Sequence, residues 1–600
     1  MLRVIQALMV FAVGLVVSCW SVSIEARDLT VTLSDEQTRQ LASHREWQLL
    51  IHEWQGKPQL TDPAFLLSRD DYSAERELKA TLNLYRLSPQ AAWCRFPARI
   101  AWLAAQQGIA LTELPEPSCD KLAQYQADVP FEHLELVFAT EVLSSSTSMM
   151  GHVFLKASGA NDDGLSQAHT FAYFTKIETL NPLVLLYDNT IGGMQGYMVV
   201  RPFHVDLAFY RDKEQRTVWQ FGLLATPQQL QLLQLHLYEI KDTKIDYYFQ
   251  AYNCATLTLE LLALLNPDVL QQRDWIVTPA DVVKAAKHYQ LVQDTDVVVA
   301  KPQQYRQLQR HLTTQQRQQL AELSQEPLAD TTLYQNAAAE QYARLLTNAQ
   351  VEQSTLSRQA QMALLQPWSA DPSTAPDYTQ QPHPAKTLGD SVLSMQAMRQ
   401  GEAQGAQFRW LANGHLLQTN NQHYQAESEL MMGNIVAQYQ QQQWRLSEFT
   451  LYSVTNLQTT SDLFPRWAGR FYVGYHPVWT NDGWDSRTEL SAGGGKSFAL
   501  TPDLTWYWLA DVGATTDFSE HRLFAGASTG MLWQLTETQK WSAAIERNSG
   551  KAAQPSDYLQ ARLGWHWQWF DDMLLSIEVS RLKHKEIDEQ QASLQWAYFY

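Results

Sequence analysis

The chain has 600 residues, which is too long for one ordinary domain, because domains usually span about 100–200 residues. Its 45 Lys and Arg against 63 Asp and Glu give a net charge of −18. That balance argues against nucleic acid as a partner, since nucleic-acid binding calls for a basic surface. The four cysteines are too few for a disulfide scaffold and too scattered for a zinc ribbon. We therefore expect several globular domains that hold neither a metal ion nor a cofactor.

The N-terminus carries an export signal. An apolar run over residues 5–17 follows Arg3, and it is too short to span a bilayer but typical of a signal peptide. Cleavage after Ala26 would make residues 1–26 the signal peptide. The alternative is lipidation of Cys19, because residues 16–19 loosely resemble a bacterial lipobox. Either route exports the chain, and no later run of about 18 apolar residues predicts a transmembrane helix.

Residues 27–127 are expected to be mostly helical, and nothing catalytic stands out in them. Export makes a disulfide between Cys94 and Cys119 plausible, because the two lie close together in one segment and the compartment is oxidising. Cys254 is then left over. Such a cysteine is either a buried inert thiol or a reactive one.

Residues 128–300 are expected to form an α+β domain. Strands are predicted at 134–138, 152–155, 170–174, 183–187 and 217–223. A helix is predicted over 227–240, with Thr226 as its N-cap and proline at its first position, and a second over 254–265. Residues 301–366 are Gln-rich but keep a leucine stripe with helical spacing, which predicts a solvated helical spacer. Residues 367–385 contain five prolines and are expected to be a linker.

Residues 386–600 have the pattern of an antiparallel β-barrel. Apolar residues alternate with polar or small ones over 504–512, 559–567 and 573–580, as in the strands of outer-membrane barrels. Of the 21 tryptophans, 13 lie after residue 400, and the chain ends in an aromatic strand like the closing strand of bacterial outer-membrane proteins. We expect roughly ten to twelve strands, an even number. The alternative is a soluble antiparallel barrel or sandwich, and the glutamines at 440–443 interrupt the apolar face.

The chemistry is expected at Cys254, which starts a predicted helix. The positive end of the helix dipole stabilises a thiolate, and the N–H groups there could form part of an oxyanion hole. A cysteine nucleophile needs a base, for which His152 at the start of a strand is the best candidate. His169, taken to open the adjacent strand, could orient the first imidazole.

Three neighbouring residues could support this site. Asn253 could cap the helix or support the oxyanion, with capping favoured. Tyr252 could be a packing or a supporting residue, and Ser148 belongs to the Ser/Thr-rich loop that runs into His152.

The order histidine, histidine, cysteine reverses that of papain. It resembles the circularly permuted branch of the NlpC/P60 (papain-like) superfamily, which includes lecithin:retinol acyltransferase-like enzymes. The motifs Ser-x-x-Gly-His and Tyr-Asn-Cys-Ala-Thr resemble those of the Lnb-type periplasmic domain family over about residues 130–270. The resemblance implies a thiol enzyme in which Cys254 matches the nucleophile, His152 the base and His169 a third member. One branch of that family is a lipoprotein N-acyltransferase.

These observations predict a multidomain envelope protein with its C-terminal barrel in the outer membrane. The favoured function is a Cys/His acyltransferase that passes an acyl group from a phospholipid through a thioester to a lipoprotein amine. The alternatives are a Cys/His hydrolase of peptidoglycan peptides or lipid esters, and a non-catalytic envelope-binding protein, in which Cys254 would be buried and unreactive.

Overall fold

The structure is a computed structural model that describes residues 33–109, 119–142, 149–175, 192–324, 328, 331–374, 376, 383–424, 426–461, 463–480, 483–517, 521–549, 558–584 and 587–600. The expected signal peptide with Cys19, the strand expected at 183–187, and Ser148 lie outside these residues. The chain divides into two compact units. The first unit comprises Met1–Leu134, Leu155–Pro202 and Leu224–Gln271, and the second comprises Glu135–Phe154, Phe203–Leu223 and Gln272–Tyr600.

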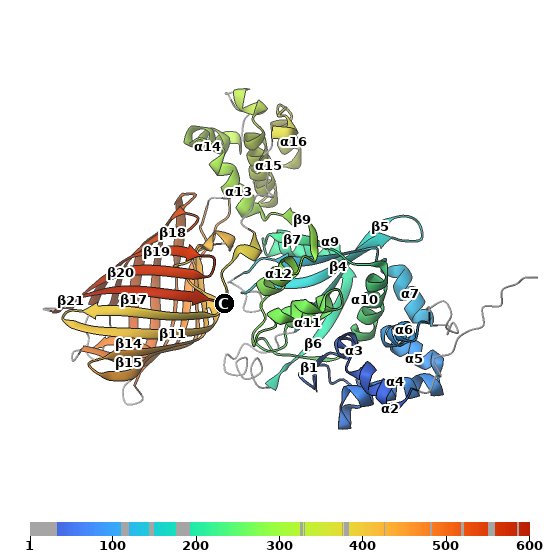
Figure 1. Cartoon of the computed structure of the whole chain (residues 1–600). Helices are drawn as coiled ribbons and strands as arrows, with labels where there is room; N and C mark the ends of the chain where they lie inside the picture. The colour runs from blue at the N-terminus through green and yellow to red at the C-terminus, as the bar shows by residue number, and fades with distance from the viewer. Residues whose placement is uncertain are drawn as a thin grey trace, which may run out of the picture. The chain divides into compact units, whose positions relative to one another are not determined.

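The N-terminal segment is helical, as predicted, and its helices start at good capping residues. Ser34 forms a capping box with Gln37, and Ser73 accepts a hydrogen bond from the backbone of Arg76. Its elements are α2 (Asp35–Ala42), α3 (Arg45–Leu50), β1 (Glu53–Trp54), β2 (Lys57–Pro58), η1 (Arg69–Asp71), α4 (Ala74–Leu87), α5 (Pro89–Arg95), α6 (Pro97–Gln106) and α7 (Asp120–Asp128), drawn in blue in Figure 1. Within the first unit, α6 packs against α10 and α3 against α11.

The middle of the chain combines helices with a seven-stranded sheet in the order β8-β6-β5-β4-β3-β7-β9. Its strands are β3 (His133–Ala139), β4 (His152–Ala160), β5 (Ser166–Thr175), β6 (Met194–Pro202), β7 (Val218–Leu223), β8 (Ile245–Tyr247) and β9 (Val292–Val298). Its helical elements are α9 (Phe203–Ala208), η4 (Phe209–Lys213), α10 (Pro227–Ile240), α11 (Cys254–Ala263), η5 (Pro267–Gln272) and α12 (Pro279–His288). The helices predicted from residues 227 and 254 are confirmed, and Thr226 caps α10 as expected.

The Gln-rich segment is helical, but its leucine stripe is buried rather than solvated. Leu308, Leu320 and Leu323 belong to one hydrophobic cluster that also takes in Trp368 and Phe464, so residues beyond the segment cover the stripe. The elements are α13 (Lys301–Arg310), α14 (Thr314–Ala321), η6 (Glu322–Ser324), η7 (Thr331–Gln335), α15 (Ala337–Glu352), α16 (Arg358–Leu365), η8 (Pro372–Thr374) and η10 (Pro384–Lys386).

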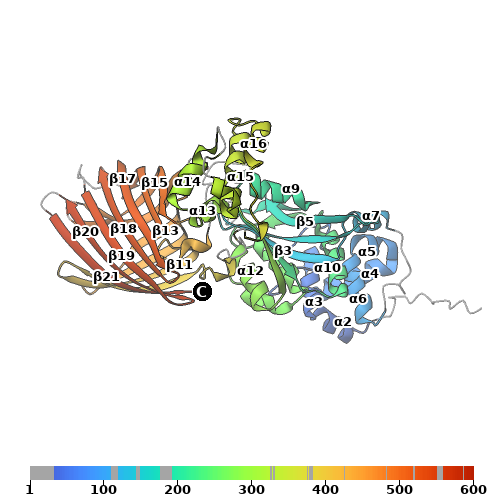
Figure 2. The ribbon, with the colours of Figure 1, turned by 90° about the horizontal axis from the view of Figure 1, so that it is seen from above.

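The C-terminal region is a closed barrel of twelve antiparallel strands, which confirms the predicted barrel and its even strand number. It closes where β10 pairs with β21, with Val392 opposite Phe599. Figure 2 shows β18, β19 and β20 as long, tilted neighbours. The elements are β10 (Val392–Gln400), β11 (Ala403–His415), η11 (Asn421–His423), β12 (Ser428–Gln440), β13 (Gln443–Asn456), β14 (Ala468–Thr480), β15 (Gly483–Thr501), β16 (Leu504–Thr516), β17 (His521–Thr536), β18 (Gln539–Ser549), β19 (Tyr558–Phe570), β20 (Met573–His584) and β21 (Ile587–Phe599).

The two faces of the barrel wall differ as the sequence alternation predicts. On β16, Trp508 and Val512 are exposed on the outside, whereas Asp511 between them is buried inside and pairs with Arg470. The glutamines at 440–443 do not break the wall, because Gln441 and Gln442 form the tight turn between β12 and β13. Both have positive φ, of 51° and 63°, as the turns that suit twisted hairpins require. Among the described residues, no helix is both long and apolar enough to cross a membrane.

Candidate active site

Cys254 is the first residue of α11, and its side chain is a buried thiol. The preceding residue, Asn253, is extended, and its side-chain oxygen accepts hydrogen bonds from the N–H groups of Ala255 at 2.8 Å and Thr256 at 3.0 Å. The capping role favoured for Asn253 is therefore confirmed. Because Asn253 already occupies these two N–H groups, the helix start offers fewer oxyanion donors than the sequence analysis expected.

Three tyrosines of the first unit surround the thiol region. The Tyr173 ring lies 5.2 Å from that of Tyr247 and 6.4 Å from that of Tyr252. Burial raises the pKa of Tyr247 well above its usual value, and the charge of Cys254 raises that pKa further, whereas a backbone hydrogen bond of Cys254 lowers it. Burial also raises the pKa of Tyr173. The phenols therefore stay neutral, and a thiolate at Cys254 would meet hydroxyl groups rather than competing negative charge.

Tyr252 is tied into a buried polar network that the sequence analysis missed. Its hydroxyl donates to Glu260 at 2.7 Å, and the same carboxylate oxygen lies 2.7 Å from Nδ1 of His52. Nε2 of His52 lies 3.0 Å from Nε2 of His236 on α10, so a single proton occupies that nitrogen–nitrogen contact. The network joins the residue two before Cys254 to the N-terminal segment.

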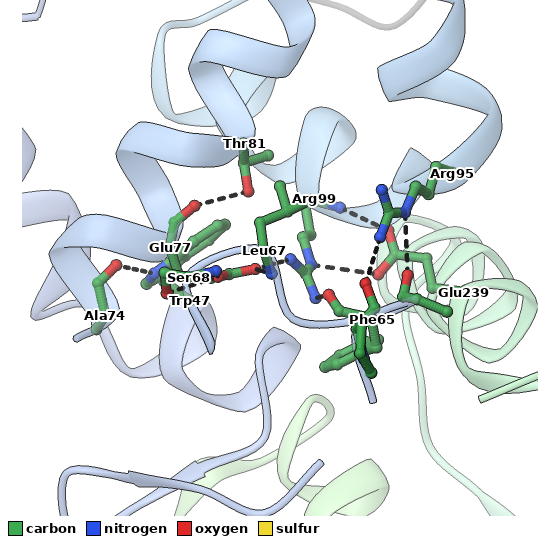
Figure 3. A network of polar contacts seen from close by, with 12 residues as sticks. Trp47, Phe65, Leu67, Ser68, Ala74, Glu77, Thr81, Arg95, Arg99 and Glu239 are labelled. Carbon is green, nitrogen blue, oxygen red and sulfur yellow. Dashed lines mark hydrogen bonds and ion pairs between the residues drawn. The ribbon is translucent and has the colours of Figure 1, made fainter. Parts of the chain in front are cut away.

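The same network continues into the helices of the N-terminal segment. Glu239, on α10, accepts hydrogen bonds from the N–H groups of Ala98 at 2.7 Å and Arg99 at 3.1 Å. It thereby caps α6, whose own N-cap residue, Phe96, supplies no side-chain hydrogen bond. Figure 3 shows the guanidinium of Arg99 between two carboxylates, 2.6 Å from Glu77 and 3.8 Å from Glu239. The side chains of this triad are fully buried.

His152 begins β4 and is buried in the second unit. Its ring lies 5.6 Å from that of Phe154 and 6.3 Å from that of Tyr210. The glycine before it is required, because Gly151 has a φ of +92° and an added Cβ would lie 2.8 Å from the ring of Phe138. The Gly-His pair of the sequence motif thus reflects a backbone position that only glycine fills without strain.

His169 does not open its strand, contrary to expectation. β5 begins at Ser166, and the register places His169 opposite Ala157 on β4. Ala157 lies five residues after His152, which is about 16 Å along a strand at roughly 3.3 Å per residue. This register does not support a direct hydrogen bond between the two imidazoles. Burial lowers the pKa of His169, and Asp128 partly opposes that shift.

Two further features complete the comparison with the sequence. Cys94 and Cys119 form the expected disulfide. In the part of the chain that the structure describes, no group of three His, Cys, Asp or Glu side chains is arranged to hold a metal ion. Of the buried polar network around Tyr252, one residue could have been noticed in the sequence. Glu260 is an acidic residue inside an otherwise apolar stretch at residues 254–265. A buried carboxylate requires a partner.

Comparison with known families agrees with the sequence motifs. Residues 121–289 match the model of the Lnb N-terminal periplasmic domain. This segment is an Lnb-type periplasmic domain. Two further models, each described only as a domain of unknown function, match residues 39–106 and 381–599 of the chain. The Lnb-type segment contains His152, His169 and Cys254, so each proposed catalytic residue lies inside it.

Solved structures similar to the chain include outer-membrane channels. The KdgM porin is 8% identical over 35% of this chain and 99% of its own, with a TM-score of 0.23. The NanC porin is 10% identical over 35% and 99%, with a TM-score of 0.24. The COG4313 outer membrane channel of Pseudomonas putida F1 is 9% identical over 36% and 96%, with a TM-score of 0.26. No curated protein matches the chain.

The barrel is assigned from its own closed strand order and apolar outer face. Together with the Lnb-type periplasmic domain, it makes the chain an exported envelope protein whose C-terminal region lies in the outer membrane.

Proposed function

We propose that the chain is an exported thiol acyltransferase of the bacterial envelope, with Cys254 as the nucleophile and His152 as the base. The observation that carries this proposal is the setting of Cys254. It is a thiol at the first position of a capped helix, among neutral phenols, inside an Lnb-type domain. The positive end of α11 favours the thiolate form that a nucleophile requires.

The reaction proceeds in two balanced steps. His152 takes the thiol proton as the Cys254 sulfur attacks an ester carbonyl, and the departing alcohol then takes that proton, which leaves an acyl thioester. In the second step an amine attacks the thioester, an amide forms, and the thiol is restored. A phospholipid is the natural ester donor for a domain joined to an outer-membrane barrel. The lipoprotein amine is the acceptor that the Lnb-type resemblance implies.

Hydrolysis uses the same thioester, with water in place of the amine. The third member of the site is left open, because the register of β5 does not bring His169 beside His152. Cys254 is only 6% exposed, which the non-catalytic alternative also predicts, so the thiol has to be tested by its chemistry.

The decisive experiment is mass spectrometry of Cys254 after incubation of the full chain with a phospholipid or with peptidoglycan fragments. We expect an acyl adduct from the phospholipid and its transfer to an added lipopeptide amine. Release of free fatty acid without amide formation would select the hydrolase, and an adduct from peptidoglycan would replace the lipid substrate. If neither substrate acylated Cys254, the proposal would be contradicted.

Two histidine variants form a matched pair for the base. His152→Asn should slow acylation of Cys254 by about 100-fold or more, which is the lower end of general-base effects. His169→Asn removes an imidazole from the neighbouring strand, and it should change the rate far less. Equal effects of the two substitutions would contradict the assignment of His152, whereas Cys254→Ala must abolish the adduct in every case.

A further inference from the structure

A cavity of about 570 Å³ lies within the second unit, between α13 and the segment that joins β13 to β14. Arg306 of α13 lines one side, and Arg466 of the joining segment lines the other. Thr460 and Ser461 add hydroxyl groups to the same wall. Two arginines and two hydroxyl-bearing residues therefore line one cavity, in a chain whose net charge is −18.

The electrostatics of this cavity favour an added negative charge. Burial, together with the positive charges of Arg310 and Arg466, lowers the pKa of Arg306 to about 10, and Glu427 partly opposes this shift. Burial also lowers the pKa of Arg466. An anion between the two arginines would relieve their mutual repulsion.

The walls of the cavity are held in place before any ligand arrives. The N–H of Thr460 donates to the Ser497 carbonyl at 2.8 Å, and the N–H of Arg466 donates to the Thr460 hydroxyl at 3.1 Å. Lys496 fixes the Arg466 carbonyl at 2.7 Å. A site that is ordered in advance loses less conformational entropy on binding.

The cavity also has an apolar wall. The ring of Phe464 contacts that of Tyr305 edge-on, with 5.7 Å between the centroids, and both residues line the cavity. Both also belong to the hydrophobic cluster of the α13–α16 helices. A ligand that joins a charged oxyanion to an apolar portion would contact both kinds of wall.

We propose that this cavity binds a phosphate group, and that a phospholipid headgroup supplies it. Guanidinium forks match phosphate oxygens in charge and geometry, and the hydroxyls can serve the remaining oxygens. An outer-membrane barrel places phospholipid headgroups within reach of its ends. The site uses none of the residues assigned to the thiol reaction, so the two proposals can be tested separately.

The test measures lipid binding to the full chain in detergent by native mass spectrometry. The ligands are phosphatidylglycerol, diacylglycerol as a lipid that lacks phosphate, and inorganic phosphate. The variant is Arg306→Gln with Arg466→Gln. Its matched control is Arg310→Gln. Arg310 lies on the same helix as Arg306 but does not line the cavity, and it pairs with Asp503. Heat-modifiable migration of the barrel on gels checks that every variant is folded.

We expect the control to bind phosphatidylglycerol like the unmodified chain, the double variant to bind it at least tenfold more weakly, and diacylglycerol not to compete. Arginine-dependent binding of inorganic phosphate, without binding of the lipid, would support the phosphate site and assign it a soluble ligand. Unchanged lipid binding by a folded double variant would overturn the proposal. Because Arg306→Lys keeps the charge but loses the fork, it should show an intermediate affinity.

Discussion

The first unit and the barrel differ in where their charged side chains lie. In the first unit, Arg99, Glu77 and Glu239 are fully buried at the junction of the N-terminal helices and α10. In the barrel, large apolar side chains such as Leu563 cover the outside, and charges such as Arg470 and Asp511 face inward. The first unit thus has charges at its centre, whereas the barrel wall is apolar toward its surroundings.

The difference shows what each region depends on. A buried charge is costly unless its partners are in place, so the first unit depends on contacts between segments far apart in sequence. Glu260 and His52, for example, are separated by 208 positions. The barrel depends instead on pairing between consecutive strands and on an outer face that suits lipid. The N-terminal segment is therefore part of the framework around Cys254 rather than a detachable neighbour.

Removing the central cation should give the largest effect. Arg99→Leu leaves the carboxylates of Glu77 and Glu239 buried without their guanidinium, which should cost about 3–5 kcal/mol of unfolding free energy. The measurement is the urea midpoint at which the thiol of Cys254 becomes open to alkylation, since this buried thiol reports on the first unit.

The control for this change is Arg95→Leu, on the adjacent helix. Arg95 is exposed and donates to the carbonyls of Ala64 and Pro63 rather than to a carboxylate. Its loss removes hydrogen bonds to two carbonyls and leaves the buried triad intact, so the urea midpoint of Cys254 alkylation should move much less. A similar shift in both variants would mean that the charge triad is not what joins the N-terminal segment to α10.

Adding a charge, rather than removing one, tests the barrel. Leu563→Arg places a charge on the outer face near the middle of β19 and should cost about 2–4 kcal/mol if that position lies near the bilayer midplane. The measurement is the urea dependence of barrel folding in lipid vesicles. The control is Arg562→Gln, because the neighbouring side chain points to the other face of the strand and already carries a charge. A folded barrel that tolerates Leu563→Arg without cost would contradict a lipid-facing surface.

The barrel could be predicted because its pattern is local. Alternation over 504–512 repeats every second residue, and the structure places those two sets of side chains on opposite faces of β16. The start of α11 was predictable for the same reason, since Asn253 caps the N–H groups of Ala255 and Thr256, two and three residues after it. In both cases the signal and the structure that it specifies lie within a few residues of each other.

The site's surroundings could not be predicted in the same way. The position of His169 depends on the turn before β5, which starts the strand at Ser166 and fixes the register with β4. The partners of Glu260 are His52 of the N-terminal segment and Tyr252 of the loop before Cys254, and no spacing in the sequence relates them. Burial of charge depends on which segments meet, and hydrophobic periodicity does not encode that.

The smallest predicted effect concerns the pH dependence of the first unit. Burial lowers the pKa of His236 below its usual value, while its contacts with Glu239 partly oppose that shift. A histidine with a lowered pKa binds its proton more readily in the unfolded chain than in the folded one. Stability from this group is therefore present above pH 6.5, the ordinary histidine value, and it is lost as the pH falls below it.

The size of this effect is bounded by one proton, so the slope cannot exceed about 1.4 kcal/mol per pH unit. We expect the urea midpoint of Cys254 alkylation to fall between pH 7.5 and 5.5, with each curve normalised to the fully unfolded rate at that pH. His236→Gln removes the titrating ring, and it should flatten the slope even if it lowers the midpoint at every pH. Parallel slopes would show that other groups carry the acid sensitivity. A flattened slope would show that protonation of His236 weakens the network that joins the N-terminal segment to the thiol helix.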